Sequence, residues 1–110
     1  MRSPLTIGAV VPSSRALARI MASQVDRNAS GVIVELGAGT GVMTQAMLEA
    51  GIAPERLLIV ERDAGLANFL STQFRHLRIV CADASRLDEV AASLNVRAVH
   101  AMVSSVPLLC

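Results

Sequence analysis

A glycine-rich turn between a predicted strand and a predicted helix constrains the fold more than any other feature of this chain. The apolar stretch Val32–Leu36 leads into the segment Gly37–Gly41, in which every second residue is glycine. Glycine lets the backbone adopt positive φ angles and approach a ligand without an intervening Cβ. The residues 42–50 then have the composition of a helix, and the first N–H groups of a helix attract polar or negative groups. Strand, glycine turn and helix in this order predict a cradle for a nucleotide-like ligand.

Strand and helix patterns alternate along the whole 110-residue chain, which is long enough for one small domain. The predicted strands are Val32–Leu36, Leu57–Glu61, Arg78–Ala82 and a strand within Val96–Val103. The predicted helices follow Ser13 or Ser14 up to about Val25 and then cover residues 42–50, 64–74 and 87–94. Alternation of this kind predicts a parallel sheet with helices on both faces, a Rossmann-like α/β fold.

Composition excludes several classes of function. Ten basic and nine acidic residues give a net charge of +1, and there is no Trp or Tyr, so nucleic acid is an unlikely partner. The two cysteines form no metal-binding spacing, and we expect no metal site. No apolar run approaches the roughly 20 residues that span a bilayer, so we expect a cytoplasmic protein without a transmembrane segment.

Polar residues stand at the ends of all four predicted strands, namely Glu35 with the glycine turn, Glu61, Asp83 and Ser104. In doubly wound folds, ligands bind at the carboxyl ends of the strands. Acidic residues are seldom left in such half-buried places unless they bind something. We therefore expect these residues to surround one ligand.

Two of the acids suit two parts of a nucleoside. Glu61 lies twenty residues after Gly41, at the end of the neighbouring strand, where a carboxylate accepts hydrogen bonds from both ribose hydroxyls. The alternative for Glu61 is a solvated acid paired with Arg62. Asp83 could accept from the exocyclic amine of an adenine, with the N–H of Ala84 as a nearby donor; the alternative for Asp83 is a helix cap.

Glu35 indicates which kind of nucleoside the predicted site would bind. A carboxylate beside the glycine turn would repel a diphosphate but attract a cationic ammonium or sulfonium group. The spacing of Gly37, Gly39 and Gly41 also differs from the GxGxxG of dinucleotide-binding folds. S-adenosylmethionine, which combines adenine, ribose, an amino-acid end and a positive sulfur, fits these residues.

The motifs VELGAGTGVMT, IVERD and CADA resemble those of class I S-adenosylmethionine-dependent methyltransferases. Residues 8–15 and 104–109 are similar to segments of bacterial phospholipid N-methyltransferases, which convert phosphatidylethanolamine towards phosphatidylcholine. That family is related to the ribosomal RNA adenine dimethyltransferases, which carry an Asn-Leu/Ile-Pro-Tyr/Phe motif after the fourth strand. Here the same place reads Ser105-Val106-Pro107-Leu108, without the Asn and the aromatic residue that hold the target adenine.

The resemblance implies a role for each motif residue. The methionine end of the cofactor would contact Gly37, Ala38, Gly39 and Gly41, with Glu35 at its ammonium group. Glu61, beside Arg62, would hold the ribose, and Asp83 with Ala84 the adenine. The carbonyl of Ser104 would lie near the sulfonium, and Pro12–Ser14 would belong to a lid. The acceptor would be a phospholipid at the membrane surface, reached from the cytoplasm by peripheral association with the inner membrane.

The resemblance also predicts how the chain is organised. Residues 1–30 would form the lid segment and a helix, and residues 31–110 an incomplete S-adenosylmethionine-binding core. With the predicted strands numbered in chain order, the sheet order would be 3-2-1-4, leaving the fourth strand as an unpaired edge. Family members are longer at both ends, so we expect this chain to be a fragment.

Three alternatives remain open from the sequence. One is a ribosomal RNA adenine N6-dimethyltransferase-like enzyme, and another is a non-catalytic module with a truncated methyltransferase fold. A third is half of a nicotinamide-dependent oxidoreductase domain, in which Glu35 and Asp83 would have no role. No catalytic base is predicted, because His100 falls within the fourth strand and His76 in a turn.

Overall fold

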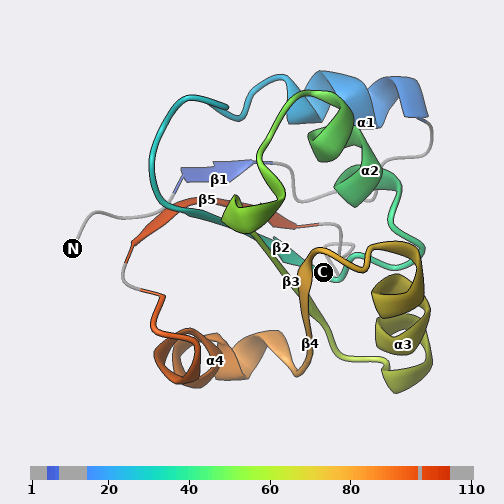
Figure 1. Cartoon of the computed structure of the whole chain (residues 1–110), viewed down its shortest axis with the longest axis vertical. Coiled ribbons are helices and arrows are strands. Elements are labelled where there is room, and N and C mark those ends of the chain that lie inside the picture. Colours follow the sequence, from blue (N-terminus) through green and yellow to red (C-terminus); the bar gives the residue numbers. More distant parts are fainter. Residues whose placement is uncertain (1–4, 8–14, 97, 105–110) are drawn as a thin grey trace, which may run out of the picture.

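The computed structural model describes residues 5–7, 15–96 and 98–104. Five parallel strands form one sheet in this part of the chain, in the order β1-β5-β2-β3-β4 (Figure 1). The strands are β1 (Leu5–Ile7), β2 (Val32–Leu36), β3 (Leu57–Glu61), β4 (Arg78–Cys81) and β5 (Val99–Ser104). The predicted Rossmann-like α/β fold is confirmed, as is the order 3-2-1-4 of the four predicted strands.

The expectation that the fourth predicted strand is an unpaired edge is wrong. This strand is β5, and β1 pairs with it in parallel on the side away from β2, with Leu5 opposite Ala101 and Ile7 opposite Val103. A three-residue strand is too short to show a period-two pattern, so the sequence did not reveal it. Pairing with β1 hydrogen-bonds backbone groups of β5 that an edge strand would leave open.

In the described part of the chain, four α-helices and two short 3₁₀ helices connect the strands. They are α1 (Arg15–Ala22), α2 (Val42–Glu49), α3 (Ala64–Gln73) and α4 (Leu87–Ser93), together with η1 (Pro54–Arg56) and η2 (Ala84–Arg86). The observed ends of α2, α3 and α4 agree with the predicted ones to within one residue. Helix α1 ends at Ala22, earlier than predicted, and the proposed cap and lid at residues 12–14 lie outside the described residues.

Helices α1, α2 and α3 cover one face of the sheet, and α4 packs on the other (Figure 1). Side chains of a strand point alternately to its two faces. In β2, Ile33 therefore joins the cluster under α1–α3, whereas Val34 joins the cluster under α4. Because α1 contributes Ala18 and Met21 to the first cluster, this helix packs into the main core. The division of the chain at residue 30 stays a prediction.

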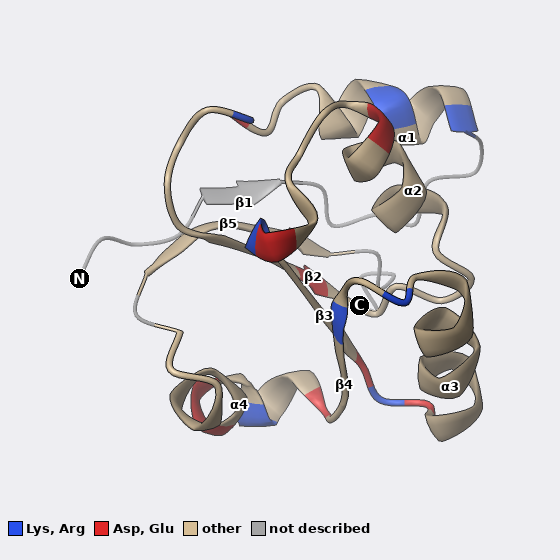
Figure 2. Ribbon diagram, viewed as in Figure 1, with Lys and Arg blue, Asp and Glu red and all other residues tan. Residues whose placement is uncertain are grey.

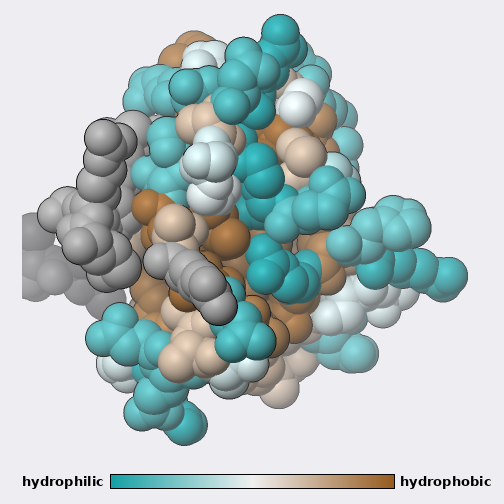
Figure 3. Space-filling view, turned by 60° about the vertical axis from the view of Figure 1, so that its left-hand side comes forward, coloured by the Kyte–Doolittle hydropathy of each residue, from teal (hydrophilic) through white to brown (hydrophobic). Residues whose placement is uncertain are grey.

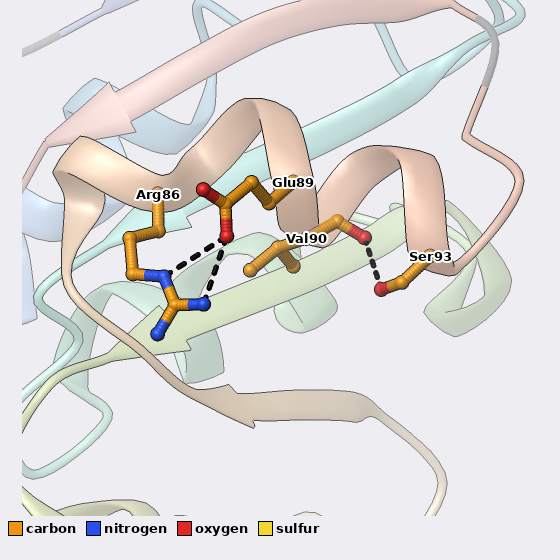
Figure 4. A network of polar contacts seen from close by, with 4 residues as sticks. All are labelled: Arg86, Glu89, Val90 and Ser93. Atoms are coloured by element: carbon orange, nitrogen blue, oxygen red, sulfur yellow. Dashed lines mark hydrogen bonds and ion pairs between the residues drawn. The ribbon is translucent and has the colours of Figure 1, made fainter.

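The α4 side of the sheet is less completely covered than the other. Val34, Leu58, Val60 and Val90 form its buried cluster, and partly buried apolar residues pack against them. One side of the molecule carries an apolar area framed by hydrophilic residues (Figure 3). At the start of α4, the guanidinium of Arg86 donates two hydrogen bonds to one carboxylate oxygen of Glu89 (Figure 4).

Candidate cofactor-binding site

The glycine turn after β2 adopts a backbone that favours glycine. Gly37, Gly39 and Gly41 have φ angles of 68°, 60° and 92°, all in the left-handed region. A Cβ at Gly41 would lie 2.6 Å from Cε2 of Phe74, the residue directly after α3, so packing as well as backbone conformation requires glycine there. A Cβ at Gly39 would have no protein atom within 4 Å. Gly39 thus lies on the open side of the turn, where a ligand can approach the backbone.

Glu61 joins the end of β3 to the glycine turn. Its Oε1 accepts a hydrogen bond of 2.9 Å from the N–H of Gly39, and its Oε2 accepts one of 2.9 Å from the N–H of Asp63. The side chain is 5% exposed. A carboxylate oxygen can accept more than one hydrogen bond, so both oxygens keep capacity for a ligand hydroxyl.

The alternative proposed for Glu61, an ion pair with Arg62, is not observed. Among the residues that the structure describes, Arg86 and Glu89 form the one ion pair. The side chain of Glu61 is held by backbone N–H groups of two different segments. This arrangement brings the ends of β2 and β3 together, as the sequence predicts.

Glu35 lies deeper than a strand-end position suggests. Alternation along β2 places its side chain on the same face as Ile33, towards α2, and the side chain is fully buried. The hydroxyl of Thr44, in the first turn of α2, donates a hydrogen bond to Oε1 of Glu35. A buried carboxylate needs such donors. The role of Glu35 at the cofactor's ammonium group stays a prediction.

Thr44 is the residue that the sequence analysis missed. It is fully buried and belongs to the face of α2 that packs on the sheet, with Met43 and Met47 as apolar neighbours. A polar residue on the apolar face of a predicted helix, nine positions after an acid in the preceding strand, was the available signal. The hydrogen bond from Thr44 to Glu35 links α2 to β2 beneath the glycine turn.

Asp83 is exposed and caps η2. Its Oδ1 accepts a hydrogen bond of 3.0 Å from the N–H of Ser85, which is the helix-cap alternative considered from the sequence. Hydrogen bonds from the backbone and side chain of Ser85 lower the pKa of Asp83 below 3.8, and the positive charge of Arg62 contributes less. Asp83 follows the end of β4 and is the N-cap residue of η2. An adenine contact by Asp83 and Ala84 stays a prediction.

The remaining site residues lie at the same edge of the sheet. Ser104 ends β5 and pairs in register with Leu36 of β2. The N–H of Gly37 donates to the carbonyl of Val60 at 2.8 Å, and Ala38 is buried. The carboxyl ends of β2, β3, β4 and β5 thus bring the predicted residues together. Residues 105–110, including the segment compared with the RNA enzymes, lie outside the described residues.

The described part of the chain shows no sign of a metal site or a membrane-spanning helix. No group of three or more His, Cys, Asp or Glu side chains there could hold a metal ion. Among the same residues, no helix has the length and apolar character that crossing a membrane requires. His76 is exposed, and His100 lies partly buried in β5. Neither histidine belongs to the cluster of site residues described above.

A parallel α/β sheet with a glycine turn tied to an acid at the end of the next strand defines a Rossmann-like nucleotide-binding fold. No family model matches the chain. The chain is similar to ribosomal RNA small subunit methyltransferases A of several organisms. With that of Maridesulfovibrio salexigens it shares 41% identity over 56 residues, 51% of this chain and 21% of the relative. With the probable ribosomal RNA small subunit methyltransferase A of Haloquadratum walsbyi the identity is 33% over 96 residues. These residues are 84% of this chain and 30% of that relative.

The chain is also similar to the ornithine lipid N-methyltransferase of Singulisphaera acidiphila. The identity is 28% over 105 residues, which are 93% of this chain and 55% of that protein. These matches confirm the resemblance to S-adenosylmethionine-dependent methyltransferases that the motifs indicate. The chain spans at most 55% of the length of these three relatives.

Proposed function

We propose that this chain is the cofactor-binding part of an S-adenosylmethionine-dependent N-methyltransferase. The observation that carries the proposal is the hydrogen bond of 2.9 Å between the N–H of Gly39 and Glu61. It places an acid that suits a ribose diol directly beside a glycine turn that is open on one side. The residues therefore fit the cofactor at the two places where a nucleoside and its amino-acid substituent need contacts.

Each site residue has a role in this proposal. The glycine turn (Gly37, Ala38, Gly39 and Gly41) would hold the methionine end, and Glu35 would offset its positive charge from below. Glu61 and Arg62 would lie at the ribose, Asp83 and Ala84 at the adenine, and Ser104 near the sulfonium. The bound cofactor supplies an electrophilic methyl group, and the chain's own residues contribute positioning and exclusion of water.

For the methyl acceptor we propose the primary amine of a polar lipid, with phosphatidylethanolamine as the first candidate. The similarity to an ornithine lipid N-methyltransferase, which extends over 93% of this chain, supports a lipid. The sequence 105–108, which lacks Asn and an aromatic residue, argues against a nucleobase. This assignment implies that the protein acts at the cytoplasmic side of a membrane and binds to that membrane peripherally.

Methylation of ribosomal RNA is the second candidate. Two of the relatives reported above are ribosomal RNA small subunit methyltransferases A, and their identities with this chain, 41% and 33%, exceed that of the lipid enzyme. Their matches cover only 21% and 30% of those proteins. The cofactor-binding half is shared by both candidates, so the acceptor must be decided by experiment.

Calorimetric titration with S-adenosylmethionine and S-adenosylhomocysteine tests the cofactor site. We expect micromolar binding by the wild-type chain and at least tenfold weaker binding by Glu61→Gln. The matched control is Glu55→Gln, an exposed acid in η1 just before β3 begins, at the opposite end of that strand. A chain that melts cooperatively but binds neither ligand would contradict the proposal and favour the non-catalytic module.

Transfer of labelled methyl groups then tests the acceptor. The substrates are vesicles with phosphatidylethanolamine, vesicles with ornithine lipid, and protein-free small-subunit ribosomal RNA. Label in either lipid supports the lipid proposal, and label in the RNA alone overturns it. The assay uses the chain whose cofactor binding has been measured, so failure to bind the cofactor and choice of another acceptor are distinguished.

A further inference from the structure

We propose that Thr44 is a positioning residue that holds the carboxylate of Glu35 so that the cofactor site selects ligands with a positively charged amino group. The inference rests on the proposed function, because it concerns how the same site recognises the amino-acid end of S-adenosylmethionine. The hydroxyl of Thr44 donates a hydrogen bond to Oε1 of Glu35. Thr44 acts only through Glu35, and Glu35 acts through its charge.

This hydrogen bond spans the base of the glycine turn. Glu35 is the acidic residue of β2, the central strand of the sheet (Figure 2), and lies two positions before Gly37. Thr44 is the third residue of α2 and lies three positions after Gly41. The contact therefore joins the two elements that flank the turn. It fixes the orientation of the carboxylate relative to the turn that would hold the methionine end.

The pair is fully buried in a part of the fold where packing does not require polar groups. Ile33, on the same face of β2, and Met47, on the same helix as Thr44, belong to the main apolar core. A buried carboxylate is costly unless it accepts hydrogen bonds, and an apolar pair of similar volume often packs as well or better. An acid with its own donor at this place therefore indicates a task other than packing.

Burial also makes the charge of Glu35 effective at the glycine turn. Water screens a charge that is excluded from solvent only weakly, so its attraction for a cation is stronger than at the surface. Glu61, the other acid beside the turn, is held by the N–H groups of Gly39 and Asp63. The two acids thus divide the proposed ligand, with Glu61 at the ribose and Glu35 at the amino group.

Substitutions at the two residues separate positioning from packing. Thr44→Val keeps the shape of the side chain and removes the hydroxyl, whereas Thr44→Ser keeps the hydroxyl and removes the methyl group. Glu35→Gln keeps an acceptor oxygen for Thr44 and removes the charge. The matched control is Thr72→Val, because Thr72 is exposed on α3 and its hydroxyl donates to a carbonyl of the same helix.

Calorimetric or competition titration with three ligands measures the selectivity. They are S-adenosylhomocysteine, its deamino analogue, which keeps the carboxylate, and 5′-methylthioadenosine, which lacks the whole amino-acid end. The wild-type chain should bind S-adenosylhomocysteine at least tenfold more tightly than the deamino analogue. Thr44→Val should weaken S-adenosylhomocysteine at least fivefold and each of the other two ligands less than twofold. Thr44→Ser and Thr72→Val should change all three by less than twofold.

A double-mutant cycle tests whether Thr44 acts through Glu35. Glu35→Gln should reduce the preference for S-adenosylhomocysteine, and adding Thr44→Val to it should weaken this ligand less than twofold further. Thermal melts establish that each variant is folded. If Thr44→Val does not fold, Thr44→Cys, whose thiol is a weaker donor, takes its place with the same expected loss of selectivity.

The possible results distinguish this inference from the proposed function. Equal weakening of all three ligands by Thr44→Val would show a general structural role and overturn the inference. Unchanged binding by Thr44→Val, or a loss as large in Thr44→Ser, would overturn it too. A wild-type chain that binds S-adenosylhomocysteine and the deamino analogue equally would overturn the inference while the cofactor site stands. A wild-type chain that binds none of the three would overturn the proposed function and the inference with it.

Discussion

The N–H of Gly39 and a carboxylate oxygen of Glu61, from residues 22 positions apart, are joined by a hydrogen bond of 2.9 Å. The other oxygen of Glu61 binds the N–H of Asp63 at the start of the next connection. One nearly buried carboxylate therefore holds the glycine turn after β2 and the turn after β3 in a fixed relation. A site for a nucleoside needs both turns in place before the ligand arrives.

Replacing Glu61 by Gln should lower the stability of the fold even without a ligand. The amide has one acceptor oxygen, so its NH₂ group must face one of the two backbone N–H donors. Loss of one such buried hydrogen bond costs about 1–3 kcal/mol in the free energy of unfolding, measured by urea denaturation. The control Glu55→Gln should change it by less than about 0.5 kcal/mol. Equal stability of the two variants would show that the hydrogen bonds of Glu61 contribute nothing.

Alanine should be tolerated differently at the two glycines. Gly39→Ala should cost about 1–2 kcal/mol, because a left-handed backbone is strained for alanine but the space around the Cβ is open. Gly41→Ala should cost about 1–3 kcal/mol more, because the new methyl group would overlap the ring of Phe74.

The double variant Gly41→Ala with Phe74→Leu separates the two causes. If the ring is responsible, the two substitutions should be non-additive, with the pair more stable than the sum of the single effects predicts. Urea denaturation of the four chains gives the coupling. Strict additivity would show that the backbone conformation alone requires glycine at residue 41.

The hydrogen bond from Thr44 to Glu35 should be important for folding. Thr44→Val keeps the shape of the side chain and removes the hydroxyl donor from a fully buried carboxylate. The expected loss is about 1–3 kcal/mol in the free energy of unfolding. Thr72→Val is a matched control, since Thr72 is exposed on α3 and its hydroxyl donates to the carbonyl of Asn68 within the same helix. A loss no larger than that of the control would contradict the prediction.

Asp83 should give the stability a dependence on acidic pH. Its pKa in the folded chain is lowered from 3.8 by the hydrogen bonds from Ser85. The charged form is therefore favoured by folding, and this contribution is present above the unfolded pKa and lost as the pH falls through the folded pKa. Asp83→Asn retains a capping side chain but cannot titrate.

Urea denaturation of the wild type and Asp83→Asn, at several pH values between neutrality and pH 3, measures this effect. The difference in unfolding free energy should be constant above the unfolded pKa. Below it, the wild type should lose stability relative to the variant. A difference that stays constant down to the lowest pH at which both chains fold would contradict the lowered pKa.

Much of the fold was predictable because local patterns repeat along the chain. Strands β2 and β3 are buried on both faces of the sheet and are therefore continuous apolar runs in the sequence. The glycine turn after β2 and Pro54 before β3 separate these runs from the neighbouring helix. Strand β1 was not predictable, because three residues carry no periodicity and their position is decided only by pairing with β5. The positions of the acids at strand ends were also predictable from the parallel order of the strands.

The sequence by itself determined the order of strands and helices, the glycine turn and the collection of polar residues at one edge of the sheet. These depend on residue types and spacing along one segment at a time. The tertiary structure alone decided that Glu61 holds Gly39, that Thr44 satisfies Glu35, and that Phe74 lies against Gly41. Each of these contacts joins different elements, and its geometry depends on how those elements pack, which no local pattern records.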